Sequence, residues 1–131
     1  RQRQMCIRDR DIKPHSIELV TNYIGFHHAS AERRRVFIES VVNLIPSGGQ
    51  LVLRDHDVVD QTMAHIVALA HDVFNAGLMT EWKINEEEIR NFTTVAQVEE
   101  ELAAYGMHME KAPLLQKGDP TLNNLMVFRK S

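Results

Sequence analysis

The sequence predicts an α/β fold in which a sheet of mainly parallel strands ends in an antiparallel strand and is flanked by helices. Short apolar runs rich in β-formers alternate with longer segments in which apolar residues recur every three or four positions. A strand and helix order of this kind predicts parallel pairing. The last two apolar runs have no helical segment between them, which predicts an antiparallel end to the sheet.

The first half of the chain contains two predicted strands with a helix between them. Residues 16–23 (SIELVTNY) form the first strand, and an amphipathic helix is predicted over 31–45, with Ser30 as its N-cap. The turn sequence PSGG at 46–49 ends this helix. Residues 50–54 (QLVLR) then form a second strand, whose nearly continuous apolar run is typical of a strand that helices cover on both faces.

A second helix is predicted over 63–74, where apolar residues again recur at steps of three and four. Gly77 follows at the position where a helix end favours a left-handed residue. The charged segment 78–93 has no clean period, and we expect it to form an irregular or short-helical excursion from the sheet.

A third helix and two closing strands complete the predicted fold. Thr94 and Gln97 have the spacing of a capping box, and the apolar stripe that follows ends at Gly106. Residues 107–111 and 125–128 are the predicted closing strands. The loop between them contains Pro and Gly, so we expect the two strands to pair antiparallel through a long hairpin.

The composition limits the classes of partner. Fifteen basic and eighteen acidic residues give a net charge of −3, which provides no electrostatic footprint for nucleic acid or an anionic membrane surface. No apolar run reaches the roughly 20 residues of a transmembrane helix. The single cysteine, Cys6, cannot form an internal disulfide. We therefore expect a small-molecule partner and a cytoplasmic, reducing setting, with no nucleic acid and no membrane.

The predicted domain covers residues 14–131, which is long enough for one hydrophobic core. Residues 1–13 are set apart because the opening RQRQMCIRDR holds four arginines and has no periodicity. We expect this tail to be disordered, or to be an artefact of translating foreign sequence at the end of a reading frame.

Three stretches, in this order, carry a resemblance to a known family. Residues 16–28 (SIELVTNYIGFHH) resemble a fourth strand and the loop after it. Residues 44–53 (LIPSGGQLVL) resemble the motif L-x-P-G-G-x-L that leads into a fifth strand, with Ser47 in place of one common small residue. Residues 118–130 resemble a final hairpin and last strand. The family is the class I S-adenosylmethionine-dependent methyltransferases, and this chain looks like the C-terminal half of their Rossmann-like domain.

The resemblance implies a strand order in which the family's fourth, fifth, seventh and sixth strands lie side by side, with the seventh antiparallel. The chain lacks the family's glycine-rich turn after the first strand and the acid that ends the second, which hold the cofactor as in dinucleotide folds. The resemblance therefore implies a parent protein of roughly double this length that uses S-adenosyl-L-methionine, and a fragment that is itself inactive. The missing first strand would pair beside residues 16–23, so we expect an exposed strand edge that favours self-association.

Ligands of open parallel sheets bind beyond the carboxyl ends of the strands, which selects two loops here. In the first loop, the resemblance places Asn22, Tyr23 and Gly25 against the cofactor and turns His27 or His28 toward the substrate. The alternative is that Tyr23 packs in the core and that the histidines lie on the surface.

The second loop begins with Asp55, His56 and Asp57. Methyl transfer from a sulfonium needs positioning and, for some acceptors, a base. We expect His56 to be the catalytic base with the help of Asp55, because nearby carboxylates raise the proton affinity of a histidine. The alternative is a polar cluster at a helix N-terminus, and we expect Asp57 to cap the following helix.

The excursion over 78–93 is where the resemblance places a substrate-covering segment, so Trp82 and Arg90 are predicted to contact substrate. For Trp82 the alternative is simple packing. The run Glu86, Glu87 and Glu88 is interpreted as a solvated face.

Two other classes of protein remain open. The pair His71 and Asp72 is similar to the HD pair of metal-dependent phosphohydrolases. That family is essentially all-helical and needs further ligands, so no metal site is predicted. A non-catalytic interaction domain on the same fold is the other alternative, and cofactor binding by the parent protein would separate it from an enzyme.

Overall fold

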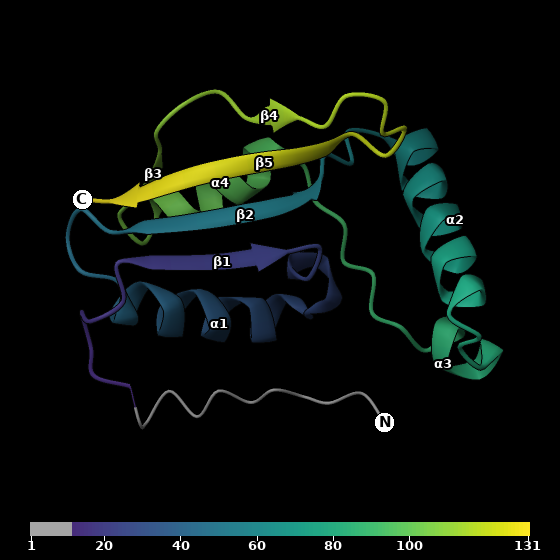
Figure 1. Ribbon diagram of the computed structural model, residues 1–131, viewed down its shortest axis with the longest axis horizontal. Helices are drawn as coiled ribbons and strands as arrows, with labels where there is room; N and C mark the ends of the chain where they lie inside the picture. Colours follow the sequence, from purple (N-terminus) through teal and green to yellow (C-terminus); the bar gives the residue numbers. More distant parts are fainter. Residues whose placement is uncertain (1–11) are drawn as a thin grey trace.

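A computed structural model describes residues 12–131, so the predicted tail, apart from its last two residues, lies outside the described residues. β1 is parallel to β2, whereas β5 is antiparallel to β2, β3 and β4. The predicted α/β fold with an antiparallel last strand is confirmed. In order across the sheet the strands are β1 (Leu19–Tyr23), β2 (Gln50–His56), β5 (Asn123–Lys130) and β3 (Met107–Met109), with β4 (Leu114–Leu115) also paired to β5 (Figure 1).

The hydrophobic core lies on one face of the sheet. Leu51 and Leu53 of β2 pair with Phe128 and Met126 of β5, and all four side chains are buried. The other residues of β2 at alternate positions are only partly buried. The described residues therefore cover one face of this strand more completely than the other, where equal cover was predicted. The core is completed by residues of α1 (Ala31–Leu44) and α4 (Val95–Ala103), among them Ile38, Val41, Val98 and Leu102.

The starts of α1 and α4 follow the capping signals in the sequence. Ser30 caps α1, because its hydroxyl accepts from the backbone N of Arg33 at 3.4 Å. After α1 the chain turns at Gly48, whose φ is 81°, and enters β2. Thr94 and Gln97 form the predicted capping box of α4. Both predicted caps are confirmed.

α2 (Gln61–Gly77) lies beyond the carboxyl ends of β1 and β2, with the short helix α3 (Trp82–Glu86) at its far end (Figure 1). Asp60 caps α2 by accepting from the backbone N of Met63 at 2.8 Å. α2 therefore borders the region beyond the carboxyl ends of the strands, where the site is expected. Within residues 12–131 no helix has both the length and the apolar character needed to cross a membrane.

The end of α2 differs from the prediction. Gly77 is the last helical residue, and the left-handed residue is Met79, with a φ of 56°. The backbone N of Met79 donates to the carbonyl of Ala76, and that of Thr80 donates to the carbonyl of Asn75. These two bonds satisfy carbonyls of the last turn. The left-handed residue that ends α2 therefore lies two positions after Gly77, where it was predicted.

β1 is an edge strand of the described sheet. Leu19 and Tyr23, on this strand, are 54% and 56% exposed. A strand whose outer edge is unpaired and whose apolar side chains are exposed is open to pairing with a further strand. The exposed edge that the sequence predicts is therefore present in the described part of the chain.

Candidate functional site

The chain turns sharply at the carboxyl end of β1. Ile24 takes a positive φ of 52°, and its backbone N donates to the carbonyl of Arg54 at 2.7 Å. A Cβ atom on Gly25 would lie 3.1 Å from Oδ1 of Asn22, so this position favours glycine. The turn leads into the 3₁₀ helix η2 (Phe26–His28), which places two histidines directly beyond the sheet.

The side chains of His27 and Asp55 form a buried pair. Nδ1 of His27 lies 2.6 Å from Oδ1 of Asp55, and the two residues are 2% and 6% exposed. A carboxylate oxygen accepts, so Nδ1 of His27 is the donor in this contact. Nε2 is buried and has no hydrogen-bond partner among the described residues. The same oxygen of Asp55 accepts from the backbone N of His56 at 2.8 Å, which fixes the carboxylate.

Four histidines from three elements gather around this pair. His27 and His28 belong to η2, His56 ends β2, and His71 belongs to α2. The ring centroid of His27 lies 4.2 Å from that of His28, 4.8 Å from that of His71 and 5.5 Å from that of His56. At this spacing positive charges repel, so the four rings cannot all be protonated near neutral pH.

Burial is the main influence on the protonation of these rings. Burial, together with the neighbouring His27 and His28, lowers the pKa of His71 to about 4. Burial and His27 also lower the pKa of His28. The pKa of His56 is lowered because burial outweighs the opposing effect of Asp55. Asp55 thus acts on the pKa of His56 in the expected direction, but the net shift is the opposite of the one expected, and these three rings are neutral at pH 7.

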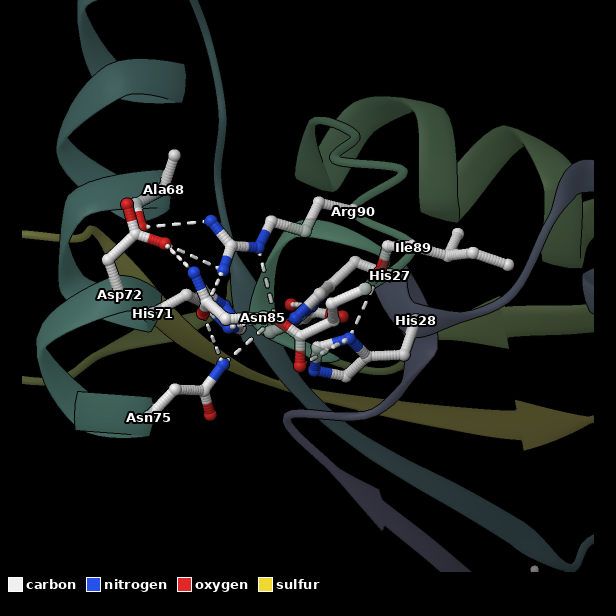
Figure 2. A network of polar contacts seen from close by, with 11 residues as sticks. His27, His28, Ala68, His71, Asp72, Asn75, Asn85, Ile89 and Arg90 are labelled. Atoms are coloured by element: carbon white, nitrogen blue, oxygen red, sulfur yellow. Dashed lines mark hydrogen bonds and ion pairs between the residues drawn. The ribbon is translucent and has the colours of Figure 1, made fainter. Parts of the chain in front are cut away.

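Arg90 is the centre of a network of polar contacts (Figure 2). Its Nε donates to Oε2 of Glu88 at 3.0 Å, and its Nη2 donates to Oδ1 of Asp72 at 2.9 Å. Further bonds reach the carbonyl of Ala68 at 3.2 Å and Oδ1 of Asn85 at 2.9 Å. The side chain is 16% exposed. Arg90, which was predicted to contact substrate, thus ties α2 to the segment that follows α3.

Glu88 lies in this network and not on a solvated face, so that part of the prediction is wrong. Its side chain is 17% exposed, and its carboxylate oxygens lie 3.6 Å from Nδ1 of His28 and 3.7 Å from Nδ1 of His71. The bond from Arg90 offsets the cost of burying this carboxylate. In the sequence, only the basic residue two positions after an acidic run indicated this role of Glu88. The sequence drew attention to His71 only through its resemblance, with Asp72, to an HD pair.

A cavity of about 790 Å³ opens beside the histidines. It is lined by His28, His56, His71 and Glu88, together with the loop from Gln116 to Thr121. The volume is in the range of small-molecule sites. His56 is the last residue of β2, so the cavity lies at the carboxyl ends of the parallel strands, where ligands of such sheets bind.

The cavity brings together only some of the predicted site residues. His28 and His56 line it, whereas Asn22, Tyr23 and Gly25 are not among its lining residues. Oδ1 of Asn22 is buried and has no hydrogen-bond partner within residues 12–131. The residues predicted to bind the cofactor therefore lie beside the cavity at the same edge of the sheet, and not in its wall.

Two further predicted residues have partners of their own. Trp82 is 60% exposed, and its Nε1 donates to Oε1 of Glu86 at 2.6 Å. Asp57 was expected to cap α2, but Asp60 caps that helix. Oδ1 of Asp57 instead accepts from the backbone N of Val95 at 2.9 Å, at the start of α4. Asp57 thus links the end of β2 to a helix much later in the chain.

The structure is similar to solved methyltransferases, although no protein-family model matches the sequence and a search of curated proteins finds no match. An O-methyltransferase family protein from Burkholderia thailandensis aligns with a TM-score of 0.64 at 12% identity, over 94% of this chain and 33% of that chain. The 1,6-didemethyltoxoflavin-N1-methyltransferase of the same organism, solved with 1,6-didemethyltoxoflavin and S-adenosylhomocysteine, aligns with a TM-score of 0.63 at 10% identity, over 94% and 48%.

The fold of this chain is therefore that of part of a class I methyltransferase domain, which confirms the resemblance at the level of the fold. The chain spans less than half the length of the two methyltransferases from Burkholderia thailandensis. A pericyclic reaction enzyme aligns with a TM-score of 0.64 at 14% identity, over 94% of this chain and 29% of that chain. The fold alone therefore does not determine the chemistry.

Proposed function

We propose that this chain supplies the acceptor side of an S-adenosylmethionine-dependent methyltransferase that acts on a small molecule. The observation that carries the proposal is the cavity of about 790 Å³ at the carboxyl ends of β1 and β2, with His56 in its wall. A cavity of this size accepts a small organic molecule. The shared fold with methyltransferases supports the reaction class.

The carboxyl end of β1 has two features that fit one edge of the cofactor. Oδ1 of Asn22 is buried without a partner among the described residues, and Gly25 allows close backbone approach because it lacks a Cβ. When bound, S-adenosyl-L-methionine would supply an electrophilic methyl group. Asn22, Tyr23 and Gly25 are the residues of this chain that would border it.

His56 is proposed to take the proton that the acceptor loses. Its Nδ1 lies 3.2 Å from the carbonyl of Thr121, and a carbonyl can only accept, so Nε2 is the free base. Burial lowers the pKa of His56, which keeps this base unprotonated at pH 7. Nε2 of His56 would accept the proton that the acceptor heteroatom loses on methylation, which leaves the neutral thioether S-adenosylhomocysteine as the other product. Asp55 holds the backbone of His56 through its N–H.

The test is a methyl-transfer assay on the complete product of the gene. The DNA is first sequenced across the 5′ boundary of this reading frame, and the encoded protein is then given S-adenosyl-L-methionine with a labelled methyl group and a panel of phenols, carboxylic acids and N-heterocycles. We expect His56→Asn to lower kcat by about 10²- to 10⁴-fold, the range for a general base. Binding of S-adenosylhomocysteine should be unchanged.

His65→Asn is the matched control, because His65 is an exposed histidine of α2 that is bonded only to Gln61 in the described contacts. It should leave turnover within twofold of the unmodified protein. Failure of the complete protein to bind S-adenosylhomocysteine would overturn the proposal. If His56→Asn leaves turnover unaffected, His56 is not the base, and only the proposed reaction class stands.

A second candidate function is a non-catalytic interaction domain that associates with itself through β1. The exposed edge strand, with Leu19 and Tyr23 more than half exposed, favours this candidate. Light scattering after size-exclusion chromatography measures the mass directly. We expect a dimer that Tyr23→Lys converts to a monomer, and a monomer at all concentrations of the unmodified chain would exclude this association.

A further inference from the structure

We propose that His27, His28 and His71 form a binding site for one transition-metal ion, best suited to Zn²⁺, with a fourth coordination position that opens into the cavity. Each of the three residues offers one ring nitrogen, and these nitrogens lie within 4.8 Å of one another. Two come from η2 and one from the middle of α2, so the site joins the end of β1 to the helix beyond it.

The strongest evidence is the state of the Nε2 atoms. Nε2 of His27 and Nε2 of His71 are both buried without a hydrogen-bond partner among the described residues, and these residues are 2% and 9% exposed. A buried polar atom without a partner is costly. Two such atoms on adjacent imidazoles, whose centroids are 4.8 Å apart, are satisfied together if one cation lies between them.

The other ring nitrogens are arranged as they are around bound metals. A metal-ligating histidine usually donates its second N–H to a carboxylate or a backbone carbonyl, which orients the ring. Nδ1 of His27 meets Asp55 at 2.6 Å, and Nδ1 of His28 meets the carbonyl of Ile89 at 3.1 Å. Nδ1 of His71 faces Glu88 at 3.7 Å. In all three rings Nδ1 faces oxygen, which favours Nε2 as the ligand. Figure 2 shows the contact between Nδ1 of His28 and the carbonyl of Ile89.

The ligand set selects the class of metal. Three imidazole ligands suit Zn²⁺, Cu²⁺, Ni²⁺ or Fe²⁺ and do not suit Mg²⁺ or Ca²⁺, which prefer oxygen. A tetrahedral zinc site has Zn–N distances of about 2.0–2.1 Å, and hence nitrogens about 3.4 Å apart. Rotation of the partly exposed His28 ring, which is 32% exposed, brings the third nitrogen closer. His28 and His71 both line the cavity, so a ligand there can take the fourth position.

A second arrangement, His27 with Asp55 and His56, also brings three possible ligands within 4.8 Å of one another. It is less suitable because Oδ1 of Asp55 already accepts from Nδ1 of His27 and from the backbone N of His56. In the proposed site the same carboxylate orients a ligand and keeps both of these bonds. The two arrangements predict different effects of mutation, which the experiment uses.

The test is metal binding by the metal-free 131-residue chain, prepared without a histidine tag and treated with EDTA. Zn²⁺ is titrated by calorimetry and in competition with a chromophoric chelator, and Co²⁺ is added separately because tetrahedral Co²⁺ absorbs strongly in the visible range. We expect one ion per chain and a tetrahedral Co²⁺ spectrum. His28→Gln and His71→Gln should each weaken Zn²⁺ binding by more than the roughly 10- to 100-fold loss caused by removing an orienting partner.

Three variants make the assignment specific. Asp55→Asn should weaken Zn²⁺ by roughly 10- to 100-fold and keep the tetrahedral spectrum, because it changes only the orienting bond. His65→Gln and His108→Gln, at exposed positions, should bind as the unmodified chain does. Circular dichroism on each variant separates loss of the metal from loss of the fold. The proposal would be overturned if the chain binds no stoichiometric Zn²⁺. It would also be overturned if His56→Gln weakens Zn²⁺ binding and His71→Gln does not.

Discussion

Asp55 holds the ring of His27 through a contact of 2.6 Å between Oδ1 and Nδ1, and the register of β1 against β2 makes this contact possible. Tyr23, the last residue of β1, pairs with Arg54. The chain that leaves β1 therefore reaches Asp55, the next residue of β2, within one tight turn. Asp55 lies two residues after Leu53 and four after Leu51, so the three side chains share one face of β2. Its carboxylate is therefore on the buried side of the sheet.

Replacing Asp55 by Ala leaves the Nδ1–H of His27 and the backbone N–H of His56 without their acceptor. Because the pair is buried, we expect the free energy of unfolding to fall by about 3 kcal/mol. Urea denaturation followed by circular dichroism measures this. Glu99→Ala, at an exposed position of α4, should change the value by less than about 0.5 kcal/mol. An equally small change for Asp55→Ala would mean that water replaces the lost bonds.

The lowered pKa values of His28, His56 and His71 predict a loss of stability in acid. In the folded chain these rings bind protons less readily than in the unfolded chain, where the ordinary value is 6.5. The folded state is therefore favoured fully above pH 6.5 and loses stability as the pH falls from there toward 4.

Urea midpoints in EDTA between pH 7.5 and pH 4.5 measure this dependence. His71→Gln removes the ring whose pKa is lowest, at about 4, and should flatten the curve over this window. An unchanged slope would show that His71 is accessible to protons in the folded chain. Burial raises the pKa of Asp119, but bonds from Thr121 together with the effects of His56 and Asn123 outweigh it. The resulting lowered pKa contributes only at lower pH.

Arg90→Lys tests whether the fork of the guanidinium holds the segment after α3. The ammonium of a lysine is a compact point charge on a flexible stem, and it does not reproduce the planar fork of donors with which Arg90 reaches Glu88, Asp72 and Asn85. We expect a loss of about 2 kcal/mol in unfolding free energy. Hydrogen exchange measured by mass spectrometry should rise over residues 82–92 and stay unchanged in β2 and β5. Equal exchange everywhere would show that apolar packing alone holds this segment.

Thr94→Ala removes the hydroxyl that accepts from the backbone N of Gln97 at 3.1 Å. The loss of an N-cap costs about 1 kcal/mol, and thermal unfolding should show a corresponding fall in Tm. Thr94→Ser keeps the hydroxyl and should restore most of the stability. If both variants behave alike, the capping bond is not what stabilises α4.

The elements that the sequence predicts correctly are those fixed by local chemistry. Ser30 and Thr94 cap helices because their side chains reach backbone N atoms three residues away, and such spacing is visible in any sequence. The short strand β4 was missed, because two residues paired to β5 leave no pattern. The end of α2 was misplaced because the turn at Met79 accepts a residue with a Cβ atom.

The site was predicted in part for a related reason. His28 and His56 follow predicted strands, so the rule for parallel sheets selects them from the sequence. His71 and Glu88 come from a helix and a loop whose place depends on how α2 is oriented against the sheet. Nothing in the spacing between residues 28, 71 and 88 indicates that they meet. The direction of the pKa shift at His56 was missed for the same reason, since burial is a tertiary property.

The loop from Gln116 to Thr121 forms one side of the cavity and is held at both ends by paired strands, because Leu115 pairs with Asn124 across its base. The histidines opposite belong to other elements. Mutation of residues 116–120 of this loop can therefore alter the shape of the cavity, while the carbonyl of Thr121 keeps its contact of 3.2 Å with Nδ1 of His56. Under the proposed function, the architecture separates most of the segment that would select a ligand from the histidines that would act on it, so related proteins could diverge in ligand preference through this short loop.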